Sequence, residues 1–192
     1  MTLVLIIVGI LVLLLVVVWF VYNRTIGRRN AVDNSWAQIE TALQRRHDLI
    51  PNLVESVKGY AAHERETFQA VTDARARAMG ASGPAAAGAA EGILSQALGK
   101  LIAVSEAYPQ LRATENFQQL QNELTNTEDQ ISAARRIYNG NVQSYNSSIQ
   151  VFPNSIIAGQ GLRGCLLLHG NPVLDLPVDS FLDARHLHDV FG

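Results

Sequence analysis

The chain has 192 residues, of which 48% are hydrophobic, and its formal net charge is -2. Without the apolar N-terminal run that is described below, this length leaves room for one soluble domain of ordinary size and hardly for two. Because the charge is close to neutral and no basic stripe stands out, the composition argues against a nucleic-acid-binding protein.

The first predicted element is an apolar run from Leu3 to Tyr22 that contains no charged residue and no proline. A helix of about twenty residues, rising ~1.5 Å per residue, crosses the ~30 Å hydrocarbon core of a bilayer. Only Met1 and Thr2 precede the run, so it lacks the basic first segment of a cleaved signal peptide. A buried core helix is the alternative, but such helices rarely stay apolar on every face. The run therefore predicts a transmembrane anchor over residues 1–22.

Three arginines predict the orientation of this anchor. Arg24, Arg28 and Arg29 follow the apolar run, whereas nothing but the α-amino group lies on its other side. The positive-inside rule then places the rest of the chain in the cytoplasm, with the anchor in the inner membrane. Cys165, the single cysteine, agrees with a reducing compartment.

Apolar residues at steps of three, four or seven predict that a helix continues from the anchor, and these residues are Val32, Trp36, Ile39, Leu43 and Ile50. Pro51 predicts a kink or a short break, since proline disfavours helical geometry in the residue before it. The apolar stripe resumes at Leu53 and fades near Met79, which predicts a second helix.

The segment from Gly80 to Gly92 is small, nearly uncharged and punctuated by glycine and proline, which predicts a flexible loop. It is not a phosphate-binding loop, because no Gly-Lys-Ser/Thr follows it. A third helix is expected from Ile93 to Ala107, with Tyr108-Pro109 ending it.

The last predicted helix is the longest and runs from Arg112 to Pro153. At ~1.5 Å per residue it would be about 60 Å long, which favours an elongated shape. The sequence thus predicts an all-α protein in which an antiparallel bundle of about four long helices occupies residues 23–159. Some positions of the apolar stripe carry other residues, namely Thr127, Ala134 or Arg135, and Asn141.

Buried polar groups need partners, so the polar residues within the apolar stripe of the last helix predict a polar network inside the bundle. Its candidate members are Arg46, His63, Glu64, Glu128 and Arg135. The alternative, in which these side chains lie on solvated faces of long helices, has equal weight.

No motif in the sequence calls for catalysis, a metal or a cofactor. His63-Glu64 begins like a zinc-protease helix, but the second histidine four positions on is missing. His186 and His188 form an H-x-H pair in a segment broken by glycines and prolines. We therefore expect no catalytic residues, no metal ligands, no cofactor and no small-molecule substrate.

Residues 22–159 resemble the LemA family in the order of their motifs. RRHDLIPNLV, the turn EAYP, FQQLQ and ARRIYN follow one another after a membrane anchor, as they do in that family. The resemblance implies a single-pass bacterial membrane protein with a helical bundle and no established reaction. A magnetosome-forming relative in magnetotactic bacteria suggests a role in membrane organisation.

The resemblance ends after Gly159, where GLRGCLLLHGNP replaces the aromatic and basic segment that is usual in the family. A reading-frame shift would produce so abrupt a loss of pattern, and divergence of the lineage is the alternative. Residues 160–192 are expected to form a poorly ordered tail that carries no function.

Two functions from different classes remain. The favoured one is a non-enzymatic membrane scaffold whose helices bind other membrane proteins or further copies of the chain. The other is a regulatory or sensory subunit of a membrane protease or transporter.

Overall fold

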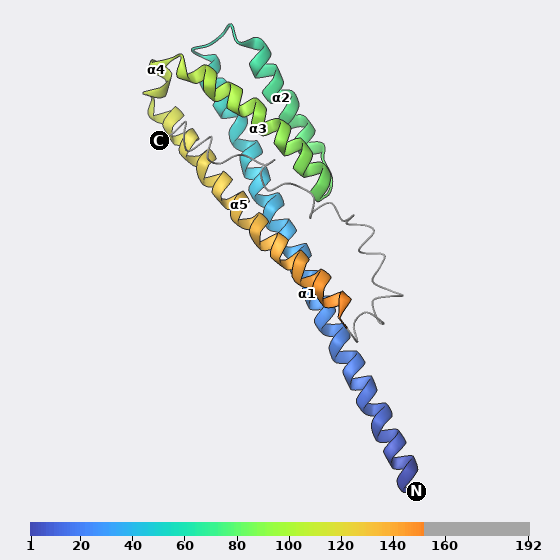
Figure 1. Ribbon diagram of the computed structural model, residues 1–192. Coiled ribbons are helices and arrows are strands. Elements are labelled where there is room, and N and C mark those ends of the chain that lie inside the picture. The colour runs from blue at the N-terminus through green and yellow to red at the C-terminus, as the bar shows by residue number, and fades with distance from the viewer. Residues whose placement is uncertain (152–192) are drawn as a thin grey trace. The chain divides into compact units, whose positions relative to one another are not determined.

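The computed structural model describes residues 1–151, and it confirms the predicted all-helical fold, with a long apolar N-terminal helix and several packed helices (Figure 1). The helices are α1 (Thr2–Lys58), α2 (Arg65–Gly80), α3 (Pro84–Glu106), α4 (Pro109–Arg112) and α5 (Glu115–Gln150). The predicted tail at 160–192 and the end of the predicted last helix at Pro153 lie outside the described residues.

Helix α1 contains the apolar run and continues beyond it without a break, as the sequence predicted. Large apolar side chains along the run are exposed, with Leu3 at 69% and Trp19 at 66%. Among the described helices, α1 alone is long and apolar enough to cross a membrane. The exposed run therefore suggests a single membrane anchor.

Pro51 was predicted to cause a kink or a short break, and the short break is wrong. Helix α1 passes through Pro51 and ends at Lys58, so the residues from Leu53 onward that were expected to begin a second helix belong to α1. The break between α1 and α2 falls at residues 59–64 instead. Arg75 of α2 donates to the His47 carbonyl, which Pro51 leaves without its usual donor.

The predicted loop from Gly80 to Gly92 is mostly helix. Only residues 81–83 separate α2 from α3, and Gly83 adopts φ 82°, a conformation that favours glycine. Pro84 then occupies the start of α3, where its fixed φ suits a helix and its missing N–H costs nothing. The alanines that follow have the highest helix propensity, which outweighs the scattered glycines.

The last helix begins later than predicted. A short α4 follows Tyr108, and α5 starts at Glu115 rather than at Arg112. Between them, the Thr114 hydroxyl donates to the Leu111 carbonyl at 2.7 Å, which satisfies a carbonyl at the end of α4.

The described residues form two compact units, one made of residues 1–38 and 134–151 and the other of residues 39–133. In the first unit, α1 and α5 run antiparallel, because contacts further along α1 are made to residues earlier in α5. The contact pairs are Arg28–Ser144, Ala31–Asn141 and Trp36–Tyr138.

The second unit packs parts of α1 and α5 with α2, α3 and the short α4 around an apolar core. In the order α1, α2, α3 and α5, the long helices alternate in direction (Figure 1). Most of the apolar positions predicted from helical periodicity are buried there. The most enclosed apolar side chains of the unit are Ile50, Val57, Ala61, Val71, Leu94, Leu101, Leu111 and Phe117, each at most 1% exposed.

Candidate functional site

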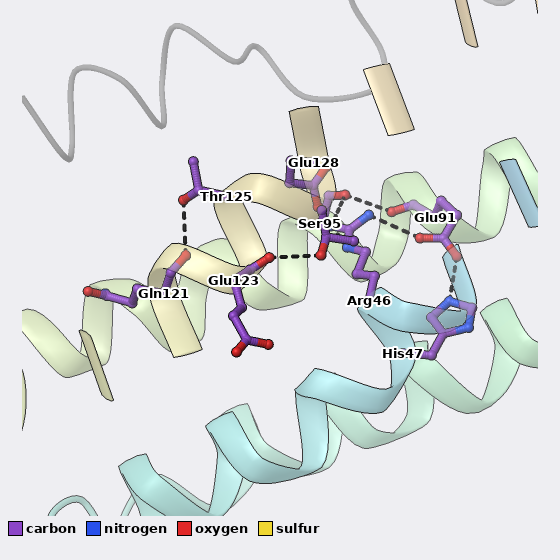
Figure 2. A network of polar contacts seen from close by, with 9 residues as sticks. Arg46, His47, Glu91, Ser95, Gln121, Glu123, Thr125 and Glu128 are labelled. Carbon is purple, nitrogen blue, oxygen red and sulfur yellow. Dashed lines mark hydrogen bonds and ion pairs between the residues drawn. The ribbon is translucent and has the colours of Figure 1, made fainter. Parts of the chain in front are cut away.

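The most unusual feature of the unit formed by residues 39–133 is a cluster of charged and polar side chains inside its core. Its members are Arg46 and His47 of α1, Glu91 and Ser95 of α3, and Glu128 of α5 (Figure 2). We call these five residues the buried polar cluster. Charged side chains are rarely enclosed unless they are paired, so the cluster is the first place to look for a function.

Arg46 lies at the centre of the cluster and is 3% exposed. Its Nη1 donates to Glu91 Oε2 at 3.0 Å and its Nη2 donates to Ser95 Oγ at 2.8 Å. Its Nε lies 2.8 Å from Glu128 Oε1, an ion pair that lacks the geometry of a hydrogen bond. One guanidinium therefore joins α1 to both α3 and α5, as its planar set of donors permits.

Glu91 is held on both of its carboxylate oxygens. His47 Nε2 donates to Oε1 at 2.6 Å, while Arg46 occupies Oε2. Ser95, one turn further along α3, donates to the Glu91 backbone carbonyl at 2.9 Å and accepts from Arg46. Each of these polar groups thus meets a partner within the cluster, which offsets the cost of removing it from water.

The local sequence explains why these side chains face the core. Arg46 and His47 lie three and four residues after Leu43, so they share the apolar face of α1. Glu91 precedes Leu94 by three residues and faces the same way on α3. Glu128 follows the buried Leu124 by four residues on α5. Helical spacing therefore places all of these charged side chains on helix faces that point into the core.

The structure brings together two of the five residues predicted for a polar network, Arg46 and Glu128. His63 and Glu64 lie exposed in the turn between α1 and α2. Arg135 is half-buried and belongs to the other compact unit.

Three members of the cluster, His47, Glu91 and Ser95, were not predicted. Glu91 was missed because the segment from Gly80 to Gly92 was interpreted as a loop, in which helical spacing has no meaning. Extending the stripe of Leu94 and Leu98 backwards by one turn would have identified Glu91 as an inward-facing acid. His47 could have been found in the same way from Leu43.

The cluster is a set of mutual contacts inside the packed unit. Two carboxylates face one guanidinium and one imidazole, and Arg46, His47 and Glu91 are each at most 4% exposed. Within residues 1–151, no group of three or more histidine, cysteine, aspartate or glutamate side chains is arranged to hold a metal ion. The arrangement is suited to fixing the register of three helices against one another.

A second polar feature lies in the unit formed by residues 1–38 and 134–151. Tyr138 is 4% exposed, and its ring packs on Trp36 with the ring centroids 5.6 Å apart. Burial raises the pKa of the Tyr138 hydroxyl, and the negative charge of Asp33 raises this pKa further.

Comparison with known proteins gives a family match over most of the chain. The model of the LemA family matches residues 35–162, which include every member of the buried polar cluster. The match agrees with the resemblance that the sequence motifs indicated.

Several curated proteins are similar to the chain. Magnetosome protein MamQ of Magnetospirillum gryphiswaldense is 25% identical, over 82% of this chain and 68% of the relative. Magnetosome protein MamQ 2 of Paramagnetospirillum magneticum is 24% identical, over 88% of this chain and 74% of the relative. Protein LemA of Metamycoplasma hominis is 28% identical, over 73% of this chain and 66% of the relative.

Proposed function

The chain belongs to the LemA family, and on this premise we propose that it is a non-enzymatic, membrane-anchored helical scaffold that binds further copies of itself. The proposal places the soluble part in the cytoplasm, next to the inner membrane.

The observation that carries the proposal is that helix α1 combines an exposed apolar part with a part that lies in the core. This one helix of 57 residues contains both the exposed apolar run and the turn at Arg46 and His47 on which the buried polar cluster is built. A helix that begins as a candidate membrane span and ends as a core element is what a tethered bundle requires. The positive charges of Arg24, Arg28 and Arg29 beside the run favour the cytoplasmic orientation.

The buried polar cluster favours a structural role over catalysis. A catalytic acid or base must reach the proton that it transfers, directly or through one water. Glu91 and His47 are instead 1% and 4% exposed and are bonded to each other. Fixing the register of α1, α3 and α5 gives the bundle defined outer faces, which specific binding needs.

Confinement to a membrane favours self-association. An anchor holds every copy in one plane, which raises the effective concentration without any new contact. Weak contacts between helix faces then suffice for assembly. The relatives named as magnetosome proteins favour membrane organisation as the purpose of that assembly in this chain.

Cysteine crosslinking in native membranes tests the proposal. In a Cys165→Ser background, Gln44→Cys or Gln119→Cys places one thiol at an exposed position of the bundle. Thr127→Cys is the matched control, because Thr127 is fully buried. At native expression level, we expect crosslinked dimers of the chain from an exposed position and none from Thr127→Cys.

Exclusively monomeric bands at every exposed position would contradict the scaffold. Crosslinks to one different membrane protein, in place of dimers, would instead favour the regulatory-subunit function.

A further inference from the structure

Helix α1 has a defect in its hydrogen bonding at the turn from His47 to Pro51. In an α-helix the N–H of each residue donates to the carbonyl four residues earlier, and proline has no N–H. Pro51 therefore leaves the His47 carbonyl without its donor inside α1. The proline ring also crowds that carbonyl, which weakens the helix at this turn.

A side chain from another helix supplies the missing donor. Arg75 of α2 donates from Nε to the His47 carbonyl oxygen at 2.7 Å, although the two residues are 28 positions apart. Arg75 is half-buried, so water competes less for this bond than at an open surface. A charged donor also makes a stronger bond than the amide that it replaces.

The side chains of the same turn contact two other helices, α3 and α5. Arg46 and His47 reach Glu91 on α3, and Arg46 also reaches Glu128 on α5. The backbone at His47, in contrast, is bonded across the unit by α2. The residues before Pro51 are thus joined to α3 and α5 through side chains and to α2 through the His47 carbonyl.

We propose that Pro51 is a hinge in α1 and that Arg75 is the latch that keeps it closed. While Arg75 bonds the His47 carbonyl, α1 keeps its helical course through Pro51. When a displacement of α2 withdraws Arg75, the carbonyl turns towards water and α1 bends at this turn. This inference is independent of the proposed scaffold function.

A double-mutant cycle on the full chain in detergent micelles tests the latch. Arg75→Met keeps an unbranched apolar stem of similar length up to Nε but removes the donor, and we expect it to lower the midpoint of thermal unfolding by several degrees. Pro51→Ala restores an N–H to the helix, so Arg75→Met should cost clearly less in that background. Arg77→Met, a change of an exposed arginine on the same helix, should shift the midpoint little. An equal loss from Arg75→Met in both backgrounds would overturn the proposal.

Distances between spin labels test the hinge itself. In a Cys165→Ser chain, labels at Gln44→Cys and Glu55→Cys, both exposed, flank Pro51 on α1 about three helical turns apart. Adding Arg75→Met should broaden the distance distribution, and adding Pro51→Ala as well should narrow it again. A distribution that stays narrow with Arg75→Met would overturn the hinge, even if the unfolding midpoints are coupled. If Arg75→Met does not fold, Arg75→Lys, which keeps a cation without the planar donor, takes its place in both measurements.

Discussion

At the scale of single residues, the stability of the core rests on how completely its charges are paired. Glu91 receives Arg46 on one carboxylate oxygen and His47 on the other, and the side chain is 2% exposed. Pairing of this kind repays the desolvation of the charges only while every partner is present. Removing one member leaves a buried charge without compensation.

Glu91→Gln should therefore lower the free energy of unfolding by about 3–5 kcal/mol, since the amide cannot balance Arg46. Urea-induced unfolding of the full chain in micelles, followed by circular dichroism, measures the loss. Asp129→Asn is the matched control, because Asp129 is exposed on α5 beside Glu128, and it should change the free energy by less than about 0.5 kcal/mol. Similar losses from the two variants would show that the buried polar cluster does not stabilise the fold.

The hydroxyl of Tyr138 gives a prediction about pH. Its pKa is raised from 10.0 by burial and by Asp33, so the folded state holds this proton more tightly than the unfolded state does. The stabilisation is fully present below the unfolded pKa and is lost as pH rises through the folded pKa. An ultraviolet titration of phenolate should show Tyr138 ionising at a higher pH than a free tyrosine. Tyr138→Phe should abolish this step, and Asp33→Asn should move it to lower pH without removing it. An unchanged titration with Tyr138→Phe would contradict the assignment.

At the scale of helices, the backbone positions that need glycine are few. Gly99 lies in the interior of α3 with open space where a Cβ would stand, so Gly99→Ala should raise the free energy of unfolding by about 0.5–1 kcal/mol. Gly83, with φ 82° and ψ 163°, adopts a conformation that only glycine reaches easily. Gly83→Ala should lower the free energy of unfolding by about 1–3 kcal/mol. Thermal unfolding of the two variants checks the opposite signs, and shifts in the same direction would contradict this account.

Sequence periodicity predicted the helices well where apolar residues recur. It failed where glycine or proline argued against a helix that other residues favour. From Leu94 to Ile102 the buried apolar residues of α3 follow helical spacing, and a helix was predicted there. The start of α3 was missed because its glycines were given more weight than the alanines around them. The sequence predicts a kink or a short break at Pro51, because spacing within one helix does not reveal that Arg75 of another helix donates to the His47 carbonyl.

The same limit applies to the buried polar cluster. Arg46 and Glu128 were predictable, because their spacing from Leu43 and Leu124 places each on the inward face of its own helix. That they meet is a property of the packing of α1 against α5. Glu91 could be predicted only from the correct start of α3, so the wrong helix boundary left this buried acid unpredicted.

At the scale of the whole molecule, the orientation of the anchor decides where the helical units act. Because Arg24, Arg28 and Arg29 follow the apolar run, a fluorescent protein fused after Phe152 should fluoresce in the cytoplasm. Alkaline phosphatase fused at the same point should be inactive, since it matures outside the cytoplasm. The reverse pair of results would invert the orientation.

The central claim is that anchored copies associate through the bundle as well as through the anchor. Single-molecule photobleaching of the full chain, carrying one fluorescent label and expressed at native level, counts the copies in each membrane complex most directly. We expect traces with more than one bleaching step, and we expect them to persist when residues 1–22 are replaced by an unrelated apolar span. Traces with a single step for the unaltered chain would contradict the account.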